Sequence, residues 1–215
     1  GLSDASEKLG RGTVTRVEKH QQTAIYVDHA IDFLRRNREK PFFLRVFPND
    51  VHDGHVPKPG SEAEWADVTE NPFEQKFFAV LKELDIQLGR LLDEIDRLGL
   101  KDDTLVVFTS DNGPTDWPSY YDRGWNPPGF TGGYFGRKWS LYEGGIRMPF
   151  IARLPGVISA GTVNDQTVMC AIDLAPTFCS MAGVPKPDGV QFDGFDMSAA
   201  LEGKAIERPG PIFWQ

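Results

Sequence analysis

The sequence is poor in cysteine, in clustered positive charge and in long apolar runs. Among its 215 residues only Cys170 and Cys179 are cysteines, and their spacing matches neither a Cys-x-x-Cys motif nor a disulfide framework. The formal net charge is −8 and no Lys/Arg cluster stands out, so the electrostatic footprint of a nucleic-acid-binding protein is absent. No apolar run approaches the roughly 20 residues that span a bilayer, so we expect no membrane span.

The chain is nevertheless long enough for one sizeable domain, or for a large part of one. Two segments carry apolar residues at helical spacing, residues 17–36 and residues 72–98. The second begins with a clear start signal, because Asn71 stands at the N-cap position, Pro72 at the first helical position and Glu74 three residues after the cap. Gly99 follows its last apolar residue and predicts the helix end.

Short apolar segments between the helices predict strands. The first, residues 41–47, is nearly continuous and lies between Pro41 and Pro48, which is typical of a strand buried on both faces. Further strands are expected within residues 104–110, 148–156 and 211–214, and a third helix is expected to begin with Asp173 as its cap. This alternation predicts an α/β fold, a sandwich with a mostly parallel or mixed sheet between helices.

Polar side chains follow two of the predicted strands. The first strand is followed by Asp50, His52, Asp53 and His55, and the second by Asp111 and Asn112. Ligands of open α/β sheets bind beyond the carboxyl ends of the strands, so these side chains are candidates for a site.

Each of these candidates also has a purely structural explanation. The carboxylate and amide oxygens of Asp111 and Asn112 suit Ca²⁺ or Mg²⁺, but the same residue types are usual in turns. His52 and His55 belong to no metal-binding helix motif, and a loop histidine is more often solvated or hydrogen-bonded.

Lys138 lies in the segment GRKWSLYEGGIRMPF, residues 136–150. Its neighbours Gly136 and Trp139 suit an ammonium group that binds an anion close to the backbone. Glu143 and Arg147 are expected to pair as structural support. The irregular stretch before this segment, residues 111–137, contains several Trp and Tyr residues that suit either sugar stacking or the packing of the loop itself.

Taken together, these stretches resemble the sulfatase family of the alkaline-phosphatase-like superfamily. The resemblance rests on VVFTSDNGP, GRKWSLYEGGIRMPFIARLPG, DVHDGHVP and AIDLAPTFCSMAGV, which follow one another in the family's order. It implies an alkaline-phosphatase-like fold that is incomplete in this chain. Residues 1–215 are then expected to form a partial sulfatase catalytic domain, without the N-terminal nucleophile region and the C-terminal subdomain.

The resemblance also implies roles for individual residues. Asp111 and Asn112 match a pair of calcium ligands, and Lys138 matches a lysine that contacts the sulfate. His52 matches the histidine of the family's His-x-Pro loop, which contacts the sulfate and the leaving oxygen, although Asp53 and Gly54 follow it here. His52 and Lys138 are therefore the expected catalytic residues, and His55 is expected to face the substrate.

One departure from the family concerns the nucleophile. Sulfatases use a formylglycine made from a Cys-x-Pro-x-Arg motif, which this sequence does not contain. We therefore expect formylglycine in a missing N-terminal region, a calcium site only partly supplied by this chain, and no activity of the chain alone.

The implied function is hydrolysis of a sulfated carbohydrate or an aryl sulfate, in the periplasm or outside the cell. The alternatives are a phosphoryl- or phosphono-monoester hydrolase of the same superfamily, and a non-catalytic fragment or binding module.

Overall fold

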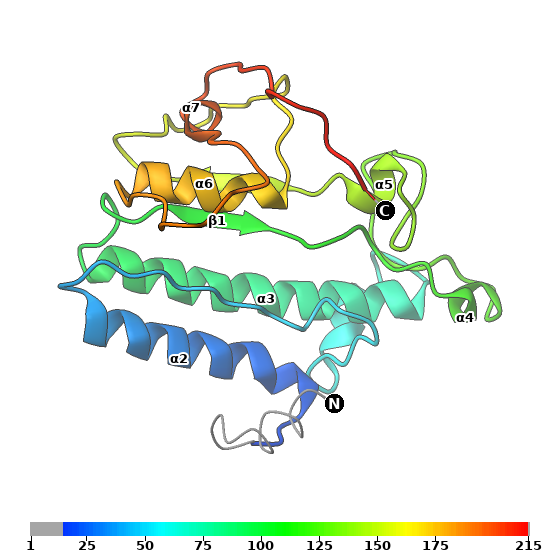
Figure 1. Ribbon diagram of the computed structural model, residues 1–215. Coiled ribbons are helices and arrows are strands. Elements are labelled where there is room, and N and C mark those ends of the chain that lie inside the picture. The colour runs from blue at the N-terminus through cyan, green and yellow to red at the C-terminus, as the bar shows by residue number, and fades with distance from the viewer. Residues whose placement is uncertain (1–14, 215) are drawn as a thin grey trace.

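Helices and extended segments alternate along residues 15–214, the part of the chain that the computed structural model describes (Figure 1). The short elements are the 3-10 turns η1 (Lys19–Gln21) and η2 (Ser61–Trp65) and the single-turn helices α4 (Pro118–Tyr121), α5 (Glu143–Ile146) and α7 (Ser198–Leu201). The longer helices are α2 (Gln22–Asn37), α3 (Pro72–Arg97) and α6 (Ala171–Met181), and the strands are β1 (Val106–Thr109) and β2 (Phe150–Arg153).

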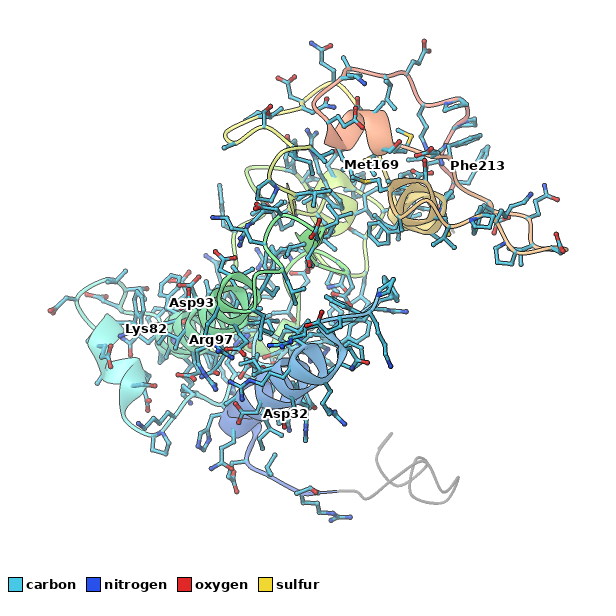
Figure 2. The ribbon with its side chains drawn as sticks, turned by 90° about the vertical axis from the view of Figure 1, so that its left-hand side faces the viewer. Asp32, Lys82, Asp93, Arg97, Met169 and Phe213 are labelled. Carbon is cyan, nitrogen blue, oxygen red and sulfur yellow. The ribbon has the colours of Figure 1, made fainter. Side chains whose placement is uncertain are left out.

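Helices α2 and α3 lie side by side and run in the same direction, and both are seen nearly end-on in Figure 2. At the predicted apolar positions, Val27, Ala30, Ile31 and Leu34 of α2 and Leu84 and Ile95 of α3 are buried. Ala79 and Val80 of α3 are buried as well, whereas Leu81, a predicted apolar-stripe position, is 42% exposed. Burying one such leucine or isoleucine side chain contributes about 1.5–3 kcal/mol. Ion pairs also join the two helices, Asp28 to Arg90 at 2.7 Å and Arg35 to the buried Glu94 at 2.8 Å.

The predicted start of α3 is confirmed. The Asn71 side chain accepts a hydrogen bond from the Phe73 backbone N–H at 3.0 Å, and Pro72 occupies the first helical position. Glu74 accepts from the Thr69 hydroxyl at 2.7 Å, and that hydroxyl in turn accepts from the Asn71 backbone N–H at 3.1 Å. The hydrogen-bonded cap of α3 therefore also includes Thr69, which precedes the residues of the sequence signal.

Strands β1 and β2 confirm two of the predicted strands and pair antiparallel, with Val106 opposite Arg153 and Thr109 opposite Phe150. Among residues 15–214 they form the sheet by themselves. In Figure 1, β1 lies between α3 and α6, so helices cover both sides of the extended layer. The prediction of an α/β fold is confirmed, and the pairing seen in this part of the chain is antiparallel.

The strand predictions for residues 41–47 and 211–214 are wrong, because neither segment forms a strand. Residues 41–47 are not buried on both faces either: burial alternates along them, and the Phe43 and Phe47 side chains are 68% and 66% exposed. Phe42 packs edge-on against Phe33 of α2, and Phe43 lies beside Phe178 of α6. An apolar segment becomes a strand only where a neighbour offers backbone hydrogen bonds, and nothing within the described residues does so here.

Helix α6 begins two residues before the predicted cap, since Cys170 is its N-cap and Asp173 its third residue. The fully buried Asp173 carboxylate accepts from the backbone N–H groups of Cys170 and Phe195, each at 2.9 Å, and from Arg208 at 3.0 Å. Asp173 thus joins the helix start to the segment that leads into α7. Both cysteines are free, which agrees with the lack of a disulfide framework in the sequence.

None of the helices within residues 15–214 combines the length and the apolar composition that crossing a membrane requires.

Candidate active site at Lys138

Two loops meet at a junction built from glycines, which we call the glycine junction (Gly113, Gly144 and Gly145). The Gly113 N–H donates to the Gly145 carbonyl at 2.9 Å, and the Lys138 N–H donates to the Pro114 carbonyl at 2.9 Å. A Cβ atom on Gly113 would lie 2.0 Å from the Gly144 oxygen, so only glycine fits there. The backbone therefore fixes the turn that contains Asp111 and Asn112 beside the segment that contains Lys138.

The structure brings together Lys138 and His52, the two residues that the sequence analysis names as expected catalytic residues. Lys138 Nζ lies 3.4 Å from His52 Nε2, although the two residues are 86 positions apart. His52 Nδ1 lies 2.6 Å from the Asp53 carbonyl, which can only accept, so Nδ1 carries the hydrogen. Nε2 is then free to accept from the Lys138 ammonium group.

The backbone beside Lys138 is in an unusual conformation. Trp139 has a φ of 71°, and among residues 15–214 it is the only non-glycine residue with a positive φ. Its ring packs edge-on against Trp117, with 5.2 Å between ring centroids, and lies 5.8 Å from Lys138 Nζ. Such backbone strain persists where surrounding contacts hold it, and it is concentrated at functional sites.

Lys19, which no sequence motif predicts as part of the site, supports the His52 loop. Its ammonium group donates to the carbonyls of His52 and Gly54, the latter at 2.8 Å. Burial lowers the pKa of Lys19, while Asp50 and Asp53 oppose that shift. No local signal identifies this lysine, because its partners are backbone carbonyls more than 30 residues away.

His55 forms part of the wall of the same loop. Its side chain is 5% exposed, its ring packs on Phe77, and Nε2 lies 3.2 Å from the Val51 carbonyl. Burial lowers the pKa of His55, so the ring is neutral at neutral pH. The sequence His55-Val56-Pro57 also has the His-x-Pro spacing, whereas the histidine that reaches Lys138 is His52. A substrate-facing role of His55 stays a prediction.

Asp111 and Asn112 are oriented in a way that suits a hard cation. The Asn112 amide donates from Nδ2 to the Gly113 carbonyl at 2.9 Å, which leaves Oδ1 to act as a ligand. The Asp111 carboxylate is exposed and makes no hydrogen bond or ion pair with any residue in the range 15–214. These oxygens fit calcium chemically but supply only part of a shell of about six ligands. Within residues 15–214, no group of three or more His, Cys, Asp or Glu side chains is placed so that it could hold a metal ion.

Arg137 organises the irregular loop, and sequence reasoning missed it as well. Its guanidinium donates to the carbonyls of Thr115 at 2.8 Å and Pro128 at 2.6 Å, and also to those of Pro127 and Gly129. Among the aromatic residues of the loop, Tyr120 is 5% exposed and is part of the packing of the loop, whereas Trp117 is 48% exposed. The expected pair of Glu143 and Arg147 is present at 3.1 Å.

Sequence relatives point to one family. The sulfatase family profile matches residues 3–184. Human steryl-sulfatase is 35% identical over 176 residues, which cover 82% of this chain and 29% of that protein. An N-acetylgalactosamine-6-O-sulfatase of Bacteroides thetaiotaomicron is 31% identical over 186 residues, which cover 84% of this chain and 34% of that protein. The chain thus spans about a third of the length of these relatives.

Solved structures of sulfatases are also similar to this chain. The PsFucS1 sulfatase from Pseudoalteromonas sp. superposes with a TM-score of 0.70 at 28% identity, over 90% of this chain and 38% of that one. The phosphonate monoester hydrolase SpPMH from Silicibacter pomeroyi, at 21% identity and a TM-score of 0.51, shares the fold. The family profile covers the Lys138 segment and the Asp111-Asn112 turn, and the relatives match most of the chain. The chain therefore belongs to the sulfatase family.

Proposed function

We propose that this chain is part of an enzyme that hydrolyses sulfate monoesters of a carbohydrate or an aryl alcohol. Lys138 and His52 would bind the sulfate and assist departure of the alcohol. The observation that carries the proposal is the 3.4 Å approach of Lys138 Nζ to His52 Nε2, beside the turn that presents Asp111 and Asn112. Lys138 and His52 would supply two nitrogen atoms for the sulfate oxygens, and Asp111 and Asn112 would supply two hard oxygen ligands for a cation beside it.

The chemistry follows from where negative charge lies. A sulfate ester carries negative charge on its oxygens, and the alcohol oxygen gains charge as its bond to sulfur breaks. Without an anion, His52 Nε2 accepts from Lys138. An anion that displaces this contact would accept from both side chains once His52 takes up a proton from solvent on Nε2. The His52 proton could then move to the leaving oxygen while Lys138 keeps its charge at the sulfate.

Asp111 and Asn112 would hold a calcium ion, which when bound would neutralise charge on the sulfate oxygens. The residues present do not fit the family's formylglycine. Cys170 caps α6 with its thiol against Asp173, and burial raises the pKa of that thiol, which disfavours the reactive thiolate. Cys179 lies on the same helix, away from any Cys-x-Pro-x-Arg motif.

The test is turnover of 4-nitrophenyl sulfate with calcium by the enzyme at its full natural length. Lys138→Ala should lower kcat/KM by about 10²–10³, the usual effect of removing a donor to a developing oxyanion. His52→Gln should lower it by about 10²–10⁴. His55→Gln should act mainly on thermal stability, because its side chain packs on Phe77.

Lys101→Ala provides the control, since Lys101 is an exposed lysine after α3 that pairs only loosely with Asp96, at 3.8 Å. Sulfatase kinetics in Lys138→Ala that equal those of the wild type would refute the proposal. If His55→Gln, and not His52→Gln, abolished turnover, the histidine assignment would be reversed.

The chain shares its fold with the Silicibacter pomeroyi hydrolase. A second candidate function is therefore hydrolysis of phosphate or phosphonate monoesters. Comparing 4-nitrophenyl phosphate and phenylphosphonate esters with the sulfate separates the two. A preference for either phosphorus ester would favour the second candidate. Lack of turnover of all three would favour a non-catalytic module.

A further inference from the structure

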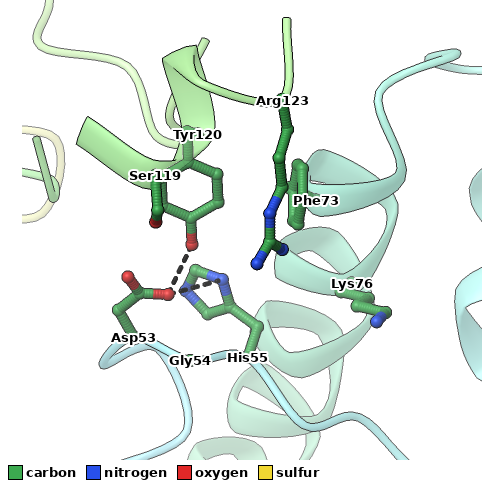
Figure 3. A pocket seen from close by; sticks show the side chains of 8 residues that line it. All are labelled: Asp53, Gly54, His55, Phe73, Lys76, Ser119, Tyr120 and Arg123. Carbon is green, nitrogen blue, oxygen red and sulfur yellow. Dashed lines mark hydrogen bonds and ion pairs between the residues drawn. The ribbon is translucent and has the colours of Figure 1, made fainter. Parts of the chain in front are cut away.

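A pocket of about 190 Å³ opens next to the His52 loop (Figure 3). The loop supplies Asp53, Gly54 and His55, α3 supplies Phe73 and Lys76, and α4 with the residues after it supplies Ser119, Tyr120 and Arg123. Asp53 directly follows His52, which contacts Lys138. The pocket therefore borders the place proposed for the sulfate without sharing its residues.

The inner wall of the pocket is built from paired and packed side chains. The Tyr120 hydroxyl donates to the Asp53 carboxylate, and the His55 ring lies 3.9 Å from the same oxygen. The Tyr120 ring packs edge-on against Phe73, with 4.8 Å between ring centroids. Both contacts are made to Oδ1 of Asp53, the one carboxylate among the described residues that line the pocket, and they hold that carboxylate at the inner wall.

The remaining charges that line the pocket are positive. The Arg123 guanidinium lies over the Phe73 ring, 5.5 Å from its centroid, and Figure 3 shows it directed into the pocket toward His55. Lys76 lies at the outer edge. Within residues 15–214 neither cation has a hydrogen-bonding or ion-pair partner, which leaves the whole donor fork of Arg123 to a ligand. Arg123 and Lys76 against the Asp53 carboxylate leave one net positive charge among the lining side chains, in a chain of net charge −8.

We propose that this pocket binds a second anionic group, a sulfate or carboxylate, of the substrate whose scissile sulfate lies at Lys138. Arg123 would hold that group through its planar donor fork, and Lys76 would add charge at the rim. The inference rests on the proposed function and narrows the substrate class to carbohydrates with two or more negative groups. A neutral aryl or steryl group would leave Arg123 without a partner.

The experiment compares two substrates in the full-length enzyme at fixed ionic strength. One is 4-nitrophenyl sulfate, which has a single anionic group, and the other is a disulfated disaccharide. Arg123→Gln should raise KM for the disaccharide about tenfold, equal to about 1.4 kcal/mol, with kcat retained and the aryl sulfate unaffected. Arg123→Lys should fall between the wild type and Arg123→Gln, because lysine keeps the charge but not the fork. Arg38→Gln, at an exposed arginine after α2, is the matched control.

Calorimetric binding of the disaccharide makes the test independent of turnover. Binding that weakens about tenfold in Arg123→Gln and stays unchanged in Arg38→Gln supports the pocket, even if no sulfate ester is cleaved, and failed cleavage would then count against the proposed function alone. Equal affinity of the wild type and Arg123→Gln for the disaccharide would overturn the inference. So would a parallel loss on both substrates, which would indicate a general structural effect.

Discussion

Replacing Gly144 by alanine tests whether the glycine junction positions the site. A Cβ atom at Gly144 would lie 2.1 Å from the Gly136 carbonyl oxygen and 2.8 Å from that of Tyr134, and both are backbone atoms that cannot move aside alone. The Gly144 N–H also donates to the Phe135 carbonyl at 2.8 Å. Alanine must therefore shift one of two backbone segments and weaken this hydrogen bond.

Crowding of this kind costs about 1–3 kcal/mol, and a weakened hydrogen bond adds about 0.5–1.5 kcal/mol. We expect Gly144→Ala to lower the free energy of unfolding by about 2–4 kcal/mol, and the Tm by roughly 5–15 °C. Gly89→Ala is the matched control, because Gly89 lies within α3 and a Cβ atom there has no neighbour within 4 Å. Alanine is the better helix former, so this change should raise stability by up to about 1 kcal/mol.

The assay is thermal and urea unfolding followed by circular dichroism, with both variants measured beside the wild type. The same chemical change should shift the midpoint in opposite directions at the two positions. If Gly144→Ala unfolded at the same midpoint as the wild type, the glycine junction would tolerate a Cβ atom at little cost. The junction would then not be rigid enough to position Lys138.

Three further changes have defined outcomes. Asp173→Asn, which breaks the buried pair with Arg208, should cost about 3–5 kcal/mol at neutral pH in urea unfolding. Burial acts to raise the pKa of Asp173, but the backbone N–H groups and Arg208 outweigh it and lower that pKa. The stabilisation is therefore present above the unfolded pKa and lost as pH falls through the folded one, so the gap between variant and wild type should shrink below about pH 4; a gap independent of pH would contradict this. Asn71→Ala should cost about 1 kcal/mol through the lost cap and about 1 kcal/mol more through the lost hydrogen bond from its amide to the Asn126 carbonyl; Asn71→Asp keeps the cap but cannot donate to that carbonyl, so denaturant midpoints should place it between the wild type and Asn71→Ala. Calcium titrated calorimetrically into this chain should bind with a Kd of about 10⁻³ M or weaker, because Asp111 and Asn112 supply two of about six ligands; tight stoichiometric binding would argue against that count.

Features that depend on neighbouring residues in sequence were predicted well. The start of α3 is set by Asn71 and Pro72 themselves, and the apolar stripes of α2 and α3 follow from helical spacing. Residues 41–47 show the opposite case, because their apolar content indicates burial but only a paired neighbour makes a strand. Phe43 and Phe47 alternate with inward residues as in a strand, yet no described segment pairs with them.

The same distinction applies to the site. The roles proposed for Lys138, His52 and Asp111 depend on their own side chains, which stand in recognisable stretches, so the sequence alone indicates them as candidates. Lys19 and Arg137 act on backbone carbonyls, and no motif records which carbonyls a folded chain will bring near. Their roles become visible only when segments distant in sequence are seen side by side.

The hydrogen bond between the Lys138 N–H and the Pro114 carbonyl also closes residues 115–137 into a loop whose two ends touch. The entropy cost of closing a loop grows only slowly with its length. Insertions and deletions near the loop tip can therefore accumulate while the ends, and the side chains on either side of them, keep their places. In evolutionary terms, the tip of this loop can vary while its ends, which flank the residues proposed to bind the sulfate, stay in place. Exchange of this loop between related enzymes is then a direct route to a new substrate range.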